Sequence, residues 1–226
     1  MPDPTDNSDI DYEDLTLDEL RVSLAPKIAD NAIFDGWSDL AVKTAAEMEG
    51  VDGDVARLAF PDGAVDMIGA WIEAVDARMA LECPADRLAE MPIRERIRTL
   101  VQCRLDAIDG QEEALKRATA ILAMPQNLGL AARRSWKSAD LMWRLAGDAA
   151  TDYNHYTKRT ILAGIYAATL AIYADDTSER KARTAEFLDR RIDGVMQFEK
   201  AKAKWLNPNR ERFSITRFLG RLRYSA

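Results

Sequence analysis

The feature that most constrains this chain is a run of fourteen residues without charge, residues 160–173, in which almost every side chain is apolar. A helix that is apolar nearly all round must be buried in a core, in a partner subunit or against an apolar ligand. The run is shorter than the roughly 20 residues that cross a bilayer. It therefore predicts a buried helix, and the polar, aromatic-rich residues 148–159 before it predict a turn.

The rest of the chain has helical rather than strand periodicity. Apolar residues recur at three- and four-residue spacing, and no segment alternates apolar and polar side chains over a sustained stretch. The chain is therefore predicted to be all-α, with about ten helices. We expect them at residues 17–35, 38–49, 52–60, 64–81, 92–108, 111–124, 128–145, 157–174, 178–204 and 214–223.

Composition narrows the possible classes of protein. A chain of 226 residues most often forms one domain. Cys83 and Cys103 do not form a Cys-x-x-Cys pair, so we expect neither structural zinc nor a disulfide, and a reduced intracellular setting. No secretory signal is apparent, and residues 1–20 hold eight acids and no base, the reverse of a mitochondrial presequence.

Charge is distributed unevenly along the chain. The net charge is -7, yet residues 200–226 carry eight bases and one acid. An acidic head and a basic tail predict two different surfaces. We expect a disordered acidic leader at 1–14, a helix-turn-helix-like unit at 15–63, a larger helical domain at 64–204, and a basic amphipathic helix at 205–226.

The segment around the polar turn carries a family pattern. It combines a Met-Trp pair, an Ala-Gly-Asp triplet and a Thr-Asp-aromatic-Asn stretch, formed by Met142, Trp143, Ala146, Gly147, Asp148, Thr151, Asp152, Tyr153, Asn154, Tyr156, Thr157 and Arg159. This pattern resembles the TetR-like lipid-binding accessory proteins of ubiquinone biosynthesis. His155 departs from it, because the family favours Trp at that position.

The resemblance implies a TetR-like fold: an N-terminal helix-turn-helix-like three-helix unit and a larger ligand-binding and dimerisation domain. It implies a homodimer formed through residues 157–174 and 184–196. It also implies a bound isoprenoid quinone precursor or other lipid as ligand, with no further cofactor. A bacterial member would work in the cytoplasm, peripherally at the inner face of the membrane.

The predicted helix-turn-helix-like unit lacks the positive charge of a DNA-binding domain. Residues 35–62 hold seven acids and two bases. DNA binding relies on Lys and Arg to displace counterions from phosphates. The unit is therefore predicted to be a scaffold that does not bind nucleic acid.

A TetR-like C-terminal domain would enclose an apolar pocket. Such apolar stripes are more often ordinary core, and it is the resemblance that favours a ligand. The predicted walls are Trp71, Ile72, Leu141, Trp143, Leu145, Ile161, Leu162, Ile165, Tyr166 and Leu170.

Partner contact is expected next to the polar turn. The resemblance implies that Met142, Asp152, His155 and Tyr156 meet a demethoxyubiquinone hydroxylase or another hydroxylase of the pathway. An exposed tyrosine beside an acid is a plausible interaction centre. The alternative is a local helix cap, in which Thr151 or Asp152 caps the next helix.

The basic tail has the pattern of an interfacial helix. Arginines lie on one face and Phe and Leu on the other, a pattern typical of helices that lie on anionic membranes. The alternative is that the apolar face packs on the protein. The residues predicted to contact the membrane are Trp205, Arg217, Phe218, Leu219, Arg221 and Leu222.

The sequence offers little for catalysis. His155 is the single histidine, and Asp152-x-x-His155 is half of a di-iron motif at most. No nucleophile elbow, phosphate loop or dinucleotide fingerprint is present, so neither a metal nor catalysis is predicted. We expect a non-catalytic lipid-binding accessory protein; the alternatives are a TetR-type ligand-responsive regulator and a structural scaffold subunit.

Overall fold

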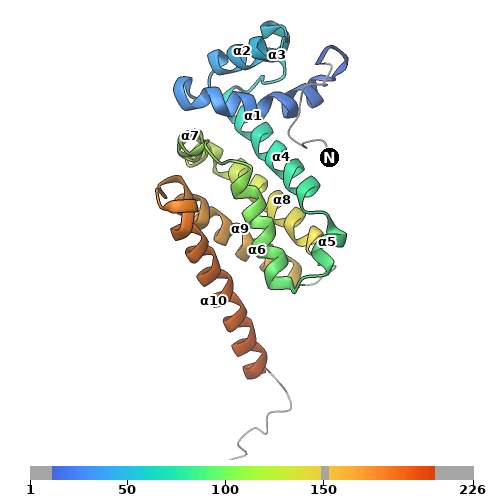
Figure 1. Cartoon of the computed structure of the whole chain (residues 1–226), viewed down its shortest axis with the longest axis vertical. Helices are drawn as coiled ribbons and strands as arrows, with labels where there is room; N and C mark the ends of the chain where they lie inside the picture. The colour runs from blue at the N-terminus through green and yellow to red at the C-terminus, as the bar shows by residue number, and fades with distance from the viewer. Residues whose placement is uncertain (1–11, 149–152, 207–226) are drawn as a thin grey trace, which may run out of the picture. The chain divides into compact units, whose positions relative to one another are not determined.

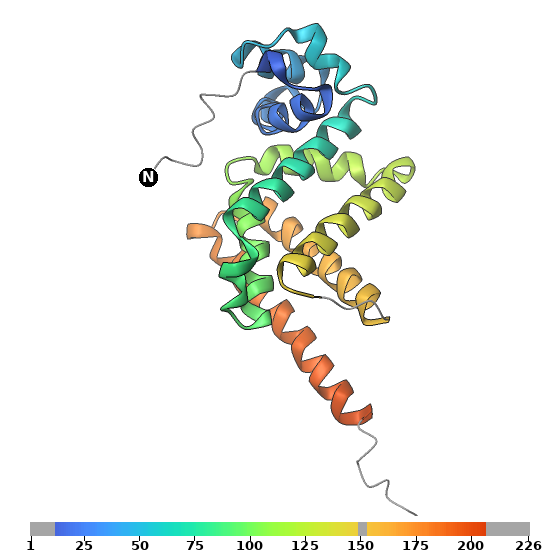
Figure 2. The same cartoon turned by 90° about the vertical axis from the view of Figure 1, so that its right-hand side faces the viewer.

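The structure, a computed structural model, describes residues 12–148 and 153–206. Over these residues it has ten α-helices and three short 3-10 helices, with no strand (Figures 1 and 2). The all-α prediction is confirmed. The chain packs as two compact units, Met1–Leu188 and Asp189–Ala226. The predicted helix at 214–223 lies outside the described residues, as does the predicted leader up to residue 11.

The first three helices form the helix-turn-helix-like part: α1 (Leu17–Asp35), α2 (Asp39–Met48) and α3 (Gly53–Leu58). Thr16 and Glu19 cap α1 reciprocally, which satisfies donors that the first turn leaves unpaired. Gly36 ends α1 with a φ of 68°, in the region that favours glycine. Pro26 lies inside α1 without ending it.

The leader is shorter than predicted at its C-terminal end. Residues 12–14 form the 3-10 helix η1 (Tyr12–Asp14). The Tyr12 hydroxyl donates a hydrogen bond to Glu49 over 2.9 Å. This contact ties the segment to the residue that follows α2.

Helix α4 (Ala64–Glu82) is the centre of the first unit. It packs against α1, α6, α7 and α8, and its buried side chains include Met67, Ile68 and Trp71. Because α1 lies against α4, the helix-turn-helix-like part shares a core with the helices that follow. The predicted boundary at residue 63 therefore does not separate compact units.

The next helices are α5 (Ala85–Ala89), α6 (Ile93–Asp106), α7 (Glu112–Leu122) and α8 (Leu128–Leu145), with η2 (Pro125–Asn127) before α8. Helix α5 was not predicted, because five residues are too few to show periodicity. Cys83 and Cys103 are joined by a disulfide. The expectation of two separate thiols is wrong, because α4 and α6 pack together and bring side chains 20 residues apart into contact.

The uncharged run lies in α9 (Tyr153–Ala174), which begins earlier than the predicted residue 157. Leu162, Tyr166 and Tyr173 are buried, whereas Gly164 and Ala171 are exposed in the single chain. Burial thus holds for one face of the helix. After η3 (Glu179–Lys181), α10 (Ala182–Leu206) completes the first unit and continues into the second.

Candidate functional site

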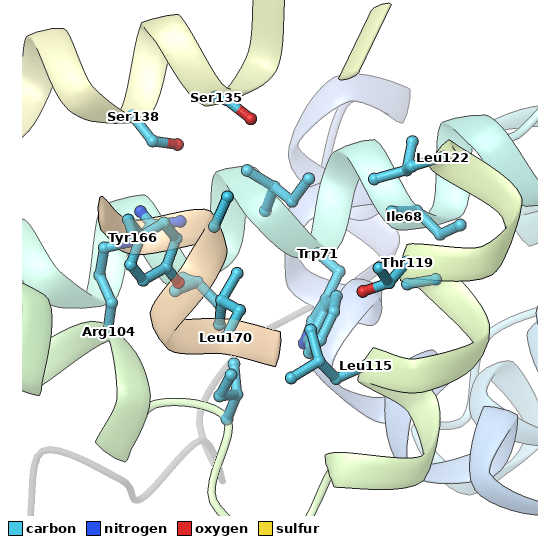
Figure 3. A pocket seen from close by; sticks show the side chains of 15 residues that line it. Ile68, Trp71, Arg104, Leu115, Thr119, Leu122, Ser135, Ser138, Tyr166 and Leu170 are labelled. Atoms are coloured by element: carbon cyan, nitrogen blue, oxygen red, sulfur yellow. The ribbon is translucent and has the colours of Figure 1, made fainter. Parts of the chain in front are cut away.

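A cavity of about 100 Å³ lies in the first unit between α4, α6, α7, α8 and α9. Figure 3 shows Arg104, Tyr166 and Leu170 on one side of it, and Ile68, Leu115 and Leu122 on the other. Most of its walls are apolar. The complete lining is Ile68, Trp71, Ile72, Val75, Arg104, Ile108, Leu115, Ala118, Thr119, Leu122, Ser135, Ser138, Tyr166, Ala167 and Leu170.

The cavity has a buried floor and an exposed rim. Trp71, Val75 and Leu115 belong to the core. Thr119 on α7, Ser135 on α8 and Ala167 on α9 are exposed. The mouth therefore lies where these three helices meet.

The tryptophan in the wall is held by hydrogen bonds. Its indole Nε1 donates to Oε1 of Gln111 over 2.9 Å. The Gln111 amide in turn donates to Asp30 on α1 over 2.7 Å. Trp37 packs on Trp71 with ring centroids 5.3 Å apart. These contacts fix the orientation of the indole at the cavity wall.

A buried polar cluster interrupts the apolar lining at one end. Arg104 pairs with Asp76, and the Ser138 hydroxyl donates to the second Asp76 oxygen over 2.8 Å. The Arg104 guanidinium lies 4.7 Å from the centroid of the Tyr166 ring. Arg104 is 2% exposed, and its Nε has no hydrogen-bond partner among the described residues.

A second buried cluster fastens α8 to α9. Arg159, also 2% exposed, contacts Asp140 over 2.5 Å and Asp148 over 3.1 Å. Lys158 contacts Asp148 over 2.5 Å. Burial acts to raise the pKa of Asp148, but the hydrogen bonds and charges of Lys158 and Arg159 outweigh it and hold that pKa below its ordinary value.

Beside this cluster lies a partly exposed aromatic group, which we call the aromatic patch: Trp136, His155 and Tyr156. The ring centroids of Trp136 and Tyr156 are 5.9 Å apart, and those of His155 and Tyr156 are 5.1 Å apart. Tyr156 is 62% exposed. The patch joins α8 to the first turn of α9 at the surface.

The predicted lipid-binding residues divide into two groups. Trp71, Ile72, Tyr166 and Leu170 line the cavity. The other six lie outside the lining. Trp143, for example, donates its indole N–H to the Lys158 carbonyl over 3.1 Å. The six are Leu141, Trp143, Leu145, Ile161, Leu162 and Ile165.

The four residues predicted to contact a partner protein do not lie together on one described surface. His155 and Tyr156 belong to the aromatic patch, and Asp152 lies outside the described residues. Met142 has no exposed surface, so its assignment to a contact surface is wrong: α8 turns this side chain into the core. Trp136 was not predicted, although it completes the patch.

Most residues predicted to contact the membrane lie outside the residues that the structure describes. Among the membrane residues, Trp205 lies in α10 without a described side chain, and Arg217, Phe218, Leu219, Arg221 and Leu222 lie beyond residue 206. Across the described ranges, no helix is both long and apolar enough to span a membrane. Within the same ranges, no group of three or more potential metal ligands occurs.

Much of the cavity lining was missed, although two sequence signals point to it. On α7, Leu115, Ala118, Thr119 and Leu122 follow helical spacing of one face. On α6, Arg104 stands four residues after Leu100, on the same face as the apolar core. A charged residue on an apolar face is informative, because charges are rarely fully buried unless paired.

Comparison with known proteins shows a similarity to one family. Residues 128–199, which include α8, α9 and the aromatic patch, match the COQ9 family model. The chain is 32% identical over 169 residues to the mitochondrial ubiquinone biosynthesis protein COQ9 of Rattus norvegicus, covering 71% of this chain and 54% of that protein. The chain is similar to the COQ9 proteins. The resemblance inferred from the residues around the polar turn is thereby confirmed.

Other COQ9 proteins agree with this placement. The Bos taurus and Homo sapiens proteins are 29% and 28% identical, each over 71% of this chain and 52% of its own length. The chain thus spans about half the length of the curated relatives it matches. Five cavity-lining residues lie within the stretch that matches the COQ9 model: Ser135, Ser138, Tyr166, Ala167 and Leu170.

A solved structure confirms the predicted fold. The TetR transcriptional regulator from Nitrosomonas europaea superposes with a TM-score of 0.61 over 80% of this chain and 98% of that chain. Sequence identity is 21%, so the likeness concerns the fold alone.

Proposed function

We propose that this protein is a non-catalytic accessory protein of ubiquinone biosynthesis. It binds an isoprenoid quinone precursor at the membrane surface and presents it to a hydroxylase. The names of the COQ9 relatives support the pathway. The apolar cavity that opens between α7, α8 and α9 is the observation that carries the lipid-binding part.

The volume of the cavity limits how the lipid is held. Sites for small molecules usually measure about 300–1,000 Å³, whereas this one measures about 100 Å³. A lipid must therefore separate the rim helices, and most of its tail stays outside. Each methylene that does enter contributes roughly 0.8 kcal/mol.

The hydroxylase docks on the aromatic patch. Large rings that are partly exposed bury much area on binding at low entropic cost. The cap alternative concerns residues 149–152, which the structure does not describe. Substituting Tyr156 by Ala should weaken binding to a demethoxyubiquinone hydroxylase. Leu81→Ala, at another exposed apolar side chain, is the control and should bind as the wild type does.

The membrane and the second subunit use other surfaces. The basic residues 205–226 contact anionic lipid, so deletion of 207–226 should reduce sedimentation with anionic liposomes. Dimerisation uses α9, where exposed Gly164 and Ala171 permit close helix approach, together with residues 184–196. Gly164→Arg should convert a dimer to a monomer in sedimentation analysis.

The experiment that tests lipid binding is extraction of the protein purified without detergent, followed by mass spectrometry of the extract. The proposal expects an isoprenoid quinone or one of its precursors. An extract without any isoprenoid or acyl lipid contradicts it and favours a structural scaffold.

A further inference from the structure

We infer that a second cavity, between the C-terminal end of α4, α5 and α6 (Figure 1), is a site of thiol–disulfide exchange. It takes a small thiol that carries a carboxylate, of which glutathione is the probe, and this thiol opens the Cys83–Cys103 disulfide. The described linings of the two cavities have no residue in common. The inference therefore goes beyond the proposed function and does not depend on lipid binding.

The first support is access to the disulfide. Both cysteines line the second cavity, which measures about 180 Å³. Exchange requires a thiolate to reach one sulfur of the disulfide. Cys83 is 3% exposed, whereas Cys103 is partly exposed, so Cys103 is the sulfur that is attacked. A cavity of about 150 Å³ holds one benzene molecule, and this one therefore admits the thiol arm of a small molecule.

The second support is a cation without a partner. Arg87 on α5 lines the cavity and is exposed, and no ion pair among the described residues includes it. Glu82, the acid of the same lining, is paired with Arg78 over 2.7 Å. The Arg87 guanidinium is therefore available to a carboxylate, which it matches in charge and in geometry. A neutral thiol gains nothing from this contact.

The third support is that the cavity does not need the disulfide to hold its shape. Leu88 on α5 is 1% exposed. The Arg96 guanidinium donates to the carbonyls of Ala89 over 2.9 Å and Met91 over 2.8 Å, and to that of Ala146 at the end of α8 over 2.8 Å. These contacts fasten the segment between the two cysteines to α6 and α8. The disulfide can therefore open while α5 stays in place.

The exchange is balanced by the small thiol alone. The thiolate sulfur bonds to Sγ of Cys103 as the bond between the two cysteine sulfurs breaks. The electron pair of that bond passes to Sγ of Cys83, which leaves as a thiolate and takes up a proton from water. The product is a mixed disulfide on Cys103 and a thiol at Cys83.

A second molecule of the thiol releases Cys103 and forms the oxidised dimer of the small thiol. The reverse sequence closes the pair, so the thiol and its oxidised dimer are the only reductant and oxidant required. Each cycle removes or restores the covalent link between α4 and α6.

The test starts from the full-length protein equilibrated with oxidised glutathione, so that the disulfide is closed. Reduced glutathione or the neutral thiol 2-mercaptoethanol is then added without denaturant. Samples are quenched with acid and analysed by intact mass and peptide mapping. We expect a mixed disulfide on Cys103 and none on Cys83.

The variant Arg87→Gln tests recognition of the carboxylate. It should slow the reaction with glutathione about two- to fivefold, the ratio that an exposed ion pair provides, and leave the reaction with 2-mercaptoethanol unchanged. The matched control is Arg57→Gln, which removes the same charge from an exposed position on α3 outside the cavity lining. It should react with both thiols at the wild-type rates.

A pair of single-cysteine variants tests which sulfur is reached. Cys83→Ser, which retains Cys103, should take up glutathione from oxidised glutathione. Cys103→Ser retains the buried Cys83 and should take it up several-fold more slowly, because a buried thiol is poorly reactive.

Several results would overturn the inference. One is a pair of thiols that stays open after treatment with oxidised glutathione, and another is a disulfide that glutathione opens only in denaturant. A mixed disulfide on Cys83 would contradict the assigned point of attack. An Arg87→Gln variant that slows both thiols alike, or neither, would contradict the carboxylate contact. Opening by a protein dithiol but not by glutathione would assign the disulfide to a protein partner. The mapping of the wild type decides the matter even if a cysteine variant does not fold.

Discussion

Trp136 on α8 packs against Tyr156 on α9, with ring centroids 5.9 Å apart. The residue before Trp136 is Ser135, which belongs to the exposed rim of the cavity. The proposed docking surface for the hydroxylase and the mouth of the cavity therefore share one turn of α8. A partner bound at the aromatic patch would act directly on the helix pair that must separate to release a lipid.

Closing the mouth should remove the lipid without harming the fold. Thr119 is exposed on α7 and lines the cavity, so Thr119→Trp is expected to fill the entrance and to lower lipid content several-fold. Its neighbour Ala120 is also exposed but does not line the cavity, and Ala120→Trp should retain lipid. The measurement is lipid per chain after extraction, alongside thermal unfolding. Equal lipid content in the two variants would contradict the assigned mouth.

The α8–α9 cluster is expected to dominate local stability. Arg159→Met leaves Asp140 and Asp148 without their shared buried partner, and should lower the free energy of unfolding by about 3–5 kcal/mol. Lys158 is substantially more exposed, and Lys158→Met should cost about 1 kcal/mol or less. Urea denaturation measures both. Similar losses for the two variants would show that the buried pairs contribute little.

Acid should destabilise the protein in part through Asp176. Burial acts to raise the pKa of Asp176, but hydrogen bonds from Ser178 and Thr184 outweigh it and hold the pKa well below its ordinary value. A group with a lowered folded-state pKa contributes stability at neutral pH that is lost as pH falls below its unfolded value, about 4.

The variant Asp176→Asn isolates this contribution. It should be less stable than the wild type at pH 7, and the difference should shrink as the pH is lowered below about 4. Urea denaturation at a series of pH values measures it. A difference that is independent of pH would assign the effect to packing instead of ionisation.

The helix-turn-helix-like part should not bind DNA. Asp52 and Asp54 lie exposed at the start of α3, where the fold would place its reading helix. Seven acids against two bases over residues 35–62 repel a phosphate backbone. An electrophoretic shift assay with promoter DNA at physiological salt should therefore show no retardation. Specific retardation would favour the ligand-responsive regulator instead.

The helices could be predicted from the sequence more fully than the cavity. Helices α8 and α9 show why. Helix α8 runs from Leu128 to Leu145 as predicted, because Pro125 marks its start and its apolar residues keep helical spacing. Helix α9 begins earlier than predicted, since its first turn is polar and lacks the apolar periodicity that reveals a helix.

The cavity depends on which faces of five helices meet, and periodicity does not determine this. Leu162 and Leu170 lie on the same apolar helix, yet only Leu170 reaches the lining. Arg104 was overlooked because α6 is rich in arginine, and the partner that makes its burial possible, Asp76, stands 28 residues earlier in the chain. The disulfide was missed for the same reason, since packing rather than sequence spacing brings Cys83 to Cys103.

Native mass spectrometry of the protein, taken directly from a detergent-free preparation, tests whether the cavity carries a lipid, because it reports bound lipid and subunit number together. We expect a mass that exceeds that of the polypeptide by one neutral isoprenoid lipid per chain, and loss of this adduct in Thr119→Trp but not in Ala120→Trp. The bare polypeptide mass, unchanged after incubation with short-tailed ubiquinone, would contradict it.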